Sequence, residues 1–168
     1  MRRTDREQEF SDFFLARGPA LRRTAYLIVR DWHTAEDLTQ QAFVKLYAAW
    51  PRVRRDSVEV YARKVVVNQC LSHLRRHRPE TPTDHLPERP AAAPHDSHDS
   101  RLDLGAALAL LAPRQRAIIA LRFLDDLAVT DVAAALGIAE GTVKSQTARA
   151  LDTLRTHLPD LVLTEESR

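Results

Sequence analysis

Five polar side chains near the C-terminal end of the chain have the chemistry to recognise nucleic acid. They belong to the segment GTVKSQTARAL, residues 141–151, and are Thr142, Lys144, Ser145, Gln146 and Arg149. Their hydroxyl, amide, ammonium and guanidinium groups are the kinds that contact phosphates and base edges in DNA. At about 100° per residue, four of them fall on one side of a helix, with Lys144 on a flank. An ordinary solvated helix face is the alternative, although such a face usually carries more Glu and Lys.

A short turn precedes this polar row. The segment TDVAAAL ends at Gly137, where the C-terminus of a helix requires a left-handed residue, and Glu140 and Gly141 open the next helix. Helix, tight turn and helix is the pattern of helix-turn-helix DNA-binding proteins, whose second helix reads the DNA. Gly141 leaves little bulk where the backbone N–H groups of that second helix can approach a phosphate. In the second helix, we expect five residues to face the core: Val143, Thr147, Ala150, Leu151 and Leu154.

A second group of candidates is basic and lies in the first half of the chain. Residues 52–78 hold eight Lys and Arg side chains against Asp56 and Glu59. Residues 1–78 carry 16 basic and 9 acidic side chains, whereas the formal net charge of the whole chain is only +2. A basic segment in a nearly neutral chain indicates a local contact with a polyanion. A solvated basic helix face is the alternative.

Composition and periodicity predict an all-α protein with two small helical domains. The chain has 168 residues, 44% of them hydrophobic, and only four Gly. Residues 79–100 are rich in Pro and acidic side chains and read as a flexible linker between domains at 1–78 and 101–158, with a short tail at 159–168. The apolar pattern predicts helices at 5–17, 20–30, 34–50, 57–77, 101–111, 113–124, 128–136 and 140–157.

The helix expected at 34–50 has two contrasting faces. Thr34 and Asp37 form a capping-box-like pair at its start. The residues expected on the apolar face are Leu38, Ala42, Leu46, Ala49 and Trp50. The opposite face presents Asp37, Gln40, Gln41 and Val44. The polar face is therefore a candidate surface for binding another protein.

Several function classes find no support in the sequence. Cys70 is the single cysteine, so we expect neither a disulfide framework nor a cysteine-based zinc site, and we interpret it as a packed, inert residue. There is no apolar run of the length of a membrane span and no signal peptide, so we expect a cytoplasmic protein without membrane insertion. No Gly-rich phosphate loop, GxSxG or HExxH pattern is present. We therefore expect no enzymatic activity, no cofactor and no metal site.

Three motifs in a fixed order resemble a known family. They are AEDLTQQAFVKLYAAW (residues 35–50), YARKVVVNQCLSHLRRHR (residues 61–78) and GIAEGTVKSQTARALDTLR (residues 137–155). Together they resemble bacterial sigma-70-type factors of the small extracytoplasmic-function (ECF) group, over about residues 10–158. The high usage of Arg and Ala is similar to that of actinobacterial members.

This resemblance implies a function for each domain. The first would be a sigma region 2-like domain that binds core RNA polymerase and the −10 promoter element, and the second a region 4-like domain that reads the −35 element. The polymerase clamp helices would meet Asp37, Gln40, Gln41 and Val44. The −10 element would meet Arg54, Arg55, Arg63, Lys64, Asn68, Arg75 and Arg76. The −35 element would meet Thr142, Lys144, Ser145, Gln146 and Arg149. An anti-sigma factor is a further partner that the resemblance allows.

The sequence departs from the common family pattern at four positions. Ala139 stands where a capping Ser is frequent, Gln146 where Arg is frequent, Ser72 where Asp is common, and Tyr61 where Trp is common. The promoter sequence therefore cannot be transferred from better-known members. The competing hypothesis is a helix-turn-helix regulator that never joins RNA polymerase and whose first domain binds a ligand or dimerises.

Overall fold

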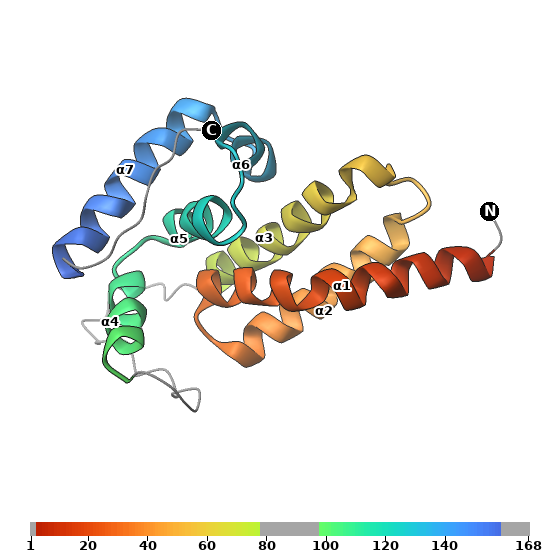
Figure 1. Cartoon of the computed structure of the whole chain (residues 1–168), viewed down its shortest axis with the longest axis horizontal. Helices are drawn as coiled ribbons and strands as arrows, with labels where there is room; N and C mark the ends of the chain where they lie inside the picture. Colours follow the sequence, from red (N-terminus) through yellow and green to blue (C-terminus); the bar gives the residue numbers. More distant parts are fainter. Residues whose placement is uncertain (1–2, 78–97, 159–168) are drawn as a thin grey trace.

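The structure, a computed structural model, describes residues 3–77 and 98–158, and no strand occurs among them. The first unit holds α1 (Arg3–Val29), α2 (Trp32–Ala49), the 3-10 turn η1 (Arg55–Ser57) and α3 (Val58–Arg76) (Figure 1). The second holds α4 (His98–Ala109), α5 (Pro113–Ile119), the π-helical turn η2 (Ala120–Leu124), α6 (Val129–Leu136) and α7 (Glu140–His157). The predicted all-α class is confirmed. Residues 1–2, residues 78–97, which include most of the linker predicted at 79–100, and the tail at 159–168 lie outside the described residues. The last three residues of the predicted linker, 98–100, belong instead to α4.

The first helix corrects the sequence prediction. Two helices were expected, at 5–17 and 20–30, with a break at Gly18–Pro19, but α1 runs unbroken through Pro19. Proline lacks the N–H for a helical hydrogen bond and usually kinks or ends a helix. Here Phe10, before the proline, and Leu21, after it, pack into the same hydrophobic core. Tertiary packing on both sides of Pro19 therefore overrides the local signal.

The start of α2 is also different from the prediction. The helix begins at Trp32, and its N-cap is Asp31, whose Oδ2 accepts a hydrogen bond from the backbone N–H of Thr34 at 2.7 Å. This hydrogen bond lowers the pKa of the Asp31 carboxyl. The predicted pairing of Thr34 with Asp37 is thus wrong, because an Asp three residues earlier supplies the cap.

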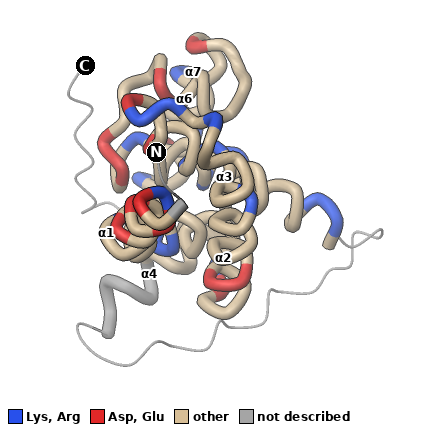
Figure 2. The backbone as a smooth tube through the Cα atoms, turned by 90° about the vertical axis from the view of Figure 1, so that its right-hand side faces the viewer, with Lys and Arg blue, Asp and Glu red and all other residues tan. Residues whose placement is uncertain are grey.

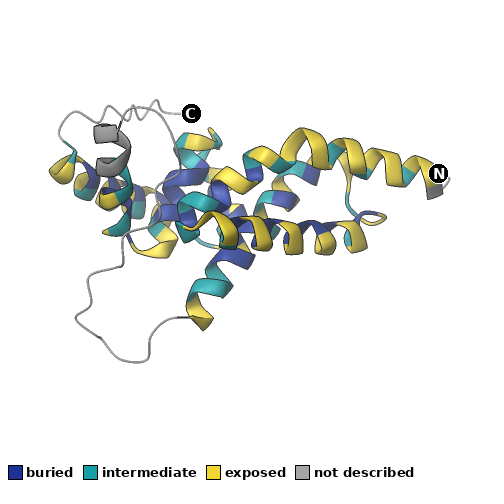
Figure 3. Ribbon diagram, turned by 90° about the horizontal axis from the view of Figure 1, so that it is seen from below, coloured by how far each residue is buried: buried dark blue, intermediate teal, exposed yellow. Residues whose placement is uncertain are grey.

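A continuous hydrophobic core joins the two units. Leu21, Ala25 and Ile28 of α1 and Val66 and Val67 of α3 belong to the same buried cluster as residues of the second unit. Those residues of the second unit are Ala117, Ile118, Leu121, Val132, Ala133, Ala135 and Val143. The contacts run from α1 to α5 and from α3 to α6, and buried positions gather where these helices meet (Figure 3). The two predicted units therefore do not stand apart in this structure.

The helix-turn-helix geometry follows the sequence closely. Gly137 ends α6 in the left-handed conformation, with φ of 65°, as its position predicted. All five residues expected on the core face of α7 are buried. Ala139 precedes α7 without a side-chain cap, so the helix start lacks the hydrogen bond that a Ser oxygen would accept from a backbone N–H of the first turn. The polar row of α7 is thereby held on a helix whose opposite face is fixed in the core.

Candidate nucleic-acid and protein interfaces

The polar row of α7 is largely open to solvent. Thr142, Lys144, Ser145 and Arg149 are exposed, whereas Gln146 is half-buried. The Ser145 hydroxyl donates to the Thr142 carbonyl at 3.2 Å. Among the described residues, neither Lys144 nor Arg149 forms an ion pair with a carboxylate. The two cations of this row are therefore available to an incoming anion.

Most of the predicted −10 residues lie on α3 and the loop before it. Arg54, Arg55, Lys64, Asn68, Arg75 and Arg76 are exposed, and only Arg63 is largely covered. Figure 2 shows basic and acidic positions interspersed along the backbone of both units. The structure thus brings most of these residues to the surface, and Asp56 and Glu59 are the acidic side chains of the same segment.

Carboxylates already pair with Arg54 and Arg55, two cations that precede α3. Arg54 pairs with Asp56 at 2.7 Å. Arg55 pairs with Glu9 of α1, and its guanidinium lies 4.6 Å from the centroid of the Trp50 ring. Trp50 itself is buried in an aromatic cluster with Phe10 and Phe13. Glu9 of α1 and the Trp50 ring therefore set the orientation of Arg55. Trp50 packs in the core, as its predicted place on the apolar face of the helix indicated.

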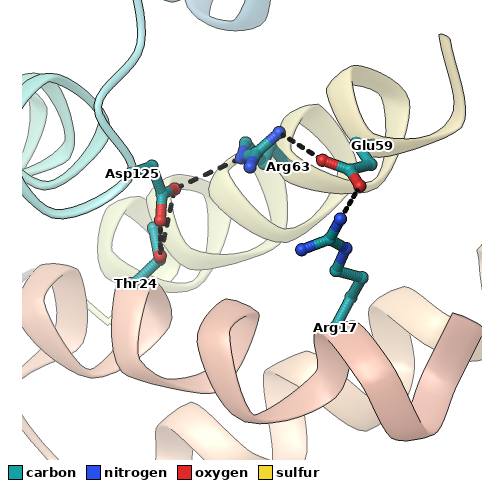
Figure 4. Close-up of polar contacts among 5 residues, drawn as sticks. All are labelled: Arg17, Thr24, Glu59, Arg63 and Asp125. Atoms are coloured by element: carbon teal, nitrogen blue, oxygen red, sulfur yellow. Dashed lines mark hydrogen bonds and ion pairs between the residues drawn. The ribbon is translucent and has the colours of Figure 1, made fainter.

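Arg63 lies in a polar network at the junction of the two units (Figure 4). Its Nε is 3.5 Å from Oδ2 of Asp125, which follows η2 in the second unit, and its Nη1 is 3.6 Å from Glu59. Glu59 also pairs with Arg17, and Asp125 accepts a hydrogen bond from the Thr24 hydroxyl at 3.1 Å. The side chain of Arg63 is 19% exposed and that of Asp125 only 8%. A predicted DNA-binding cation is therefore engaged by a carboxylate of the other unit.

Burial dominates the electrostatics of Asp125. Desolvation raises the pKa of its carboxyl, while the charge of Arg63 and the hydrogen bond from Thr24 act in the opposite direction. The ion pair thus recovers only part of the cost of taking this carboxylate out of water. The junction accommodates the charge at a cost in stability.

Arg116 forms the second polar contact across the junction. Its Nε donates to the Ile28 carbonyl of α1 at 2.8 Å, and its Nη1 donates to the Leu111 carbonyl at 2.7 Å. Burial, and then the positive charge of Arg30, lower its pKa to about 10, so it stays protonated near neutral pH. Because Ile28 lies in the last turn of α1, Arg116 satisfies one of the carbonyl groups that a helix end leaves unpaired.

Sequence reasoning did not identify Asp125 or Arg116 as junction residues. For Arg116 a signal existed, since it shares a helix face with Ile119 and Ala120, and a charged residue on an apolar face usually has a specific partner. Asp125 lies in a turn, where an Asp is common for local reasons. Nothing in its spacing indicates a partner 101 residues earlier.

The predicted protein-binding face of α2 is exposed. Asp37, Gln40, Gln41 and Val44 all lie at the surface, and Val44 is 71% exposed. Gln41 accepts a 3.3 Å hydrogen bond from Nε2 of Gln69 on α3. Since Asp31 serves as the N-cap, Asp37 is not needed to start the helix. This face therefore combines polar groups with an unburied aliphatic side chain, as many protein-binding surfaces do.

Other kinds of site find little support in the part of the chain that is described. There, no group of three or more His, Cys, Asp or Glu residues is placed to hold a metal ion. Burial raises the pKa of the Cys70 thiol to about 12, which keeps it unreactive. The cavity beside Arg63 and Asp125 has a volume of about 40 Å³, far below the roughly 300–1,000 Å³ of small-molecule pockets. None of the described helices is both long and apolar enough to cross a bilayer.

Comparisons with known families and proteins match both units. Residues 13–80 match the family model "Sigma-70 region 2", and residues 101–154 match "Sigma-70, region 4". The chain is 37% identical over 152 residues to the "RNA polymerase sigma-E factor" of Streptomyces coelicolor, covering 89% of this chain and 86% of that protein. It is 34% identical over 145 residues to the "ECF RNA polymerase sigma factor SigE" of Mycolicibacterium smegmatis, covering 81% of this chain and 56% of that one.

A solved structure is similar over nearly the whole chain. It is the sigma factor RpoE of Bartonella quintana in complex with the anti-sigma factor NepR, with a TM-score of 0.76 and 28% sequence identity. The match covers 91% of this chain and 98% of that one.

Proposed function

Since the chain belongs to the sigma-70 family of bacterial RNA polymerase sigma factors and is similar to its ECF members, we propose that its two units divide promoter recognition between them. The observation that carries this proposal is the presence of region 2 and region 4 in one chain and in the order of the family. The role is one of recognition: the chain joins core RNA polymerase and directs initiation to its promoters.

We assign the three surfaces to separate partners. The α2 face with Asp37, Gln40, Gln41 and Val44 would bind the clamp helices of the polymerase. The loop and α3, through the cations from Arg54 to Arg76 and the amide of Asn68, would hold the −10 element. The open row of α7 would enter the major groove at the −35 element, where its short polar groups and Arg149 can contact base edges and phosphates. The exposure of these surfaces, apart from Arg63, supports the assignment.

The alternative, a regulator that senses a ligand in its first domain, has less support. The cavity at the junction has room for little more than water. An anti-sigma factor is a further proposed partner, because Bartonella RpoE has been solved in complex with one and shares the fold. Bacterial RNA polymerase is a cytoplasmic enzyme, so the proposal also places the chain there.

A pull-down of core polymerase tests this function. Asp37, Gln40 and Val44 are exposed and none of them caps α2, so the triple change to Ala should leave the free energy of unfolding within about 1.5 kcal/mol. We expect polymerase retention by this variant to fall at least tenfold. The matched control is Asp152→Ala, an exposed position on α7, which should retain polymerase fully. Failure of the unaltered chain to retain polymerase would contradict the sigma-factor function. Equal retention by the triple variant would remove only α2 from the interface.

A further inference from the structure

A relay of amide groups connects the backbone at the start of α5 to the polar row of α7. The backbone N–H of Ala112 donates to Oε1 of Gln115 at 3.1 Å. Nε2 of Gln115 in turn donates to Oε1 of Gln146 at 3.1 Å. Both glutamine side chains are half-buried, between the exposed surface and the core.

The polarity of this relay is set by a group that cannot reverse. A glutamine amide can rotate by 180° and exchange its oxygen with its nitrogen, but a backbone N–H is always a donor. The atom of Gln115 that faces Ala112 must therefore be its oxygen, which directs its NH₂ group towards α7. The atom of Gln146 that meets this NH₂ must then also be an oxygen. As a result, the NH₂ group of Gln146 is the part left for an outside partner.

The NH₂ group of Gln146 belongs to the surface of α7 that is proposed to bind DNA. It shares a helix face with the exposed Thr142 and Arg149, which the proposed function places at the major groove. In that groove guanine presents only acceptors, N7 and O6, and cytosine only a donor, its N4 amino group. An amide that displays NH₂ can hydrogen-bond to the first and not to the second.

We propose that Gln115 is a positioning residue that determines the base preference of Gln146. The inference rests on the proposed function and deepens it. Gln115 touches no DNA; it holds the amide of Gln146 with its donor outwards, so that the chain prefers guanine over cytosine at the base Gln146 meets. The residue at position 146 alone does not set the specificity.

Replacement of Gln115 by Glu should reverse this preference. A glutamate oxygen still accepts the Ala112 N–H, and Glu is favoured three residues after an N-cap, so the fold should be preserved. The other carboxylate oxygen can only accept, so it recruits the NH₂ of Gln146 and turns the Gln146 oxygen outwards. Cytosine should then be preferred over guanine. Gln115→Met removes the relay at similar size and leaves the amide free to adopt either orientation.

The experiment uses the full chain with bacterial core RNA polymerase and a promoter library randomised through the −35 region. Each promoter variant carries its own barcode in the transcribed region, and sequencing of the barcodes in the transcripts gives the base preference at each position. Gln146→Ala first identifies the contacted position as the one where discrimination is lost. There we expect the unaltered chain to favour G over C by about tenfold. Gln115→Glu should favour C over G, and Gln115→Met should bring the ratio close to one.

The ratio of G to C at the base that Gln146 contacts distinguishes a positioning role of Gln115 from a purely structural one. A negative charge near DNA, or a loosened helix, lowers output from all promoters and leaves the ratio unchanged. An unchanged ratio in both Gln115 variants, or equal changes at all positions, would overturn the inference. So would a Gln146→Ala variant that loses discrimination nowhere. Initiation by the unaltered chain with no Gln115 dependence leaves the proposed function standing, whereas no initiation on any promoter removes the function itself.

Discussion

The row on α7 and the cations around α3 are both candidate DNA contacts, but the structure holds them differently. Among the described residues, Lys144 and Arg149 of α7 face solvent without a carboxylate partner. Arg54, Arg55 and Arg63 are paired with Asp56, Glu9 and Asp125. Under the proposed function, the −35 surface can meet DNA as it stands, whereas three of the −10 cations must first exchange a carboxylate for a phosphate.

The origin of these carboxylates sharpens the difference. Asp56 is local to the loop and Glu9 belongs to α1, but Asp125 comes from the other unit. An exposed pair such as Arg54–Asp56 is worth at most about 1 kcal/mol and exchanges readily. In the Arg63 pair, Asp125 is buried and Arg63 is largely covered, and one unit packs on the other around them. We therefore expect exchange of this pair to require separation of the units.

The largest expected effect comes from Arg116, which holds together the junction of the two units, where Arg63 is covered. Arg116→Ala removes two charge-assisted hydrogen bonds and leaves the Ile28 and Leu111 carbonyls unpaired, so we expect a loss of about 3 kcal/mol in the free energy of unfolding. Urea unfolding measures this loss. Arg114→Ala, an exposed arginine on the same helix, is the control and should cost no more than about 0.5 kcal/mol. Similar losses in both variants would show that the junction does not depend on Arg116.

Arg149 tests the role of the exposed polar row of α7 in reading the −35 element. Arg149→Ala should weaken −35-dependent transcription by about 1–3 kcal/mol, because a contact to a base or phosphate is lost, while the thermal melting temperature stays unchanged. Transcription from promoters with an intact and a scrambled −35 element measures the effect. If the variant loses the same activity on both promoters, Arg149 does not read this element.

Asp125 tests whether the attraction between charges or the packing of apolar side chains holds the junction of the two units together. Burial raises the pKa of Asp125 in the folded chain, so the native state binds this proton more tightly than the unfolded state. Its favourable contribution is present below the unfolded value of 3.8 and is lost as the pH rises through the folded pKa. The stability of Asp125→Asn relative to the unaltered chain should therefore increase with pH over this range. Urea unfolding at pH 3.5 and pH 7 measures the change. A decrease would show that attraction to Arg63 outweighs desolvation.

The smallest expected effect separates stability from DNA contact at the start of α7. Gly141 has open space around the position of a Cβ and no positive φ, so Gly141→Ala should stabilise the fold by about 0.5–1 kcal/mol. If the helix N-terminus approaches a phosphate, the same change should lower −35 DNA affinity. Thermal melting and DNA titration together measure the two effects. Gly137→Ala is the counterpart: its φ of 65° predicts a destabilised fold. Gain of both stability and affinity in Gly141→Ala would remove the N-terminus from the interface.

Local sequence signals predicted the helices and the faces that depend on one helix. The bounds of α6 and α7, the left-handed Gly137 and the buried face of α7 all follow from periodicity and turn chemistry. The same reasoning separated the exposed Gln40 from the buried Leu38 on α2. A single helix determines each of these features, so the spacing of its residues is sufficient.

Features that depend on contacts distant in sequence were missed. Pro19 is a helix breaker by local rules, and only the packing of Phe10 and Leu21 on the same core shows why α1 continues. The pairing of Arg63 with Asp125 joins residues from different units, and the polarity of Gln146 depends on Gln115, 31 residues away. No periodicity records such partners. For this reason the junction and the relay were visible only in the structure.

The core shared by the two units has a consequence for how fully the chain occupies a promoter. The names of the −10 and −35 elements place them about 25 base pairs apart, which is about 85 Å of DNA axis. The 18 residues of α7 extend only about 27 Å, and its unit packs directly against α1 and α3. Under the proposed function, the two units must separate before one molecule can bind both elements at once, and the apparent affinity for the whole promoter is the intrinsic affinity reduced by the fraction of separated molecules. Ile28 of α1 and Ile118 of α5 are fully buried in this shared core, so we expect that trimming either one favours the separated form from a position outside the proposed DNA and polymerase surfaces.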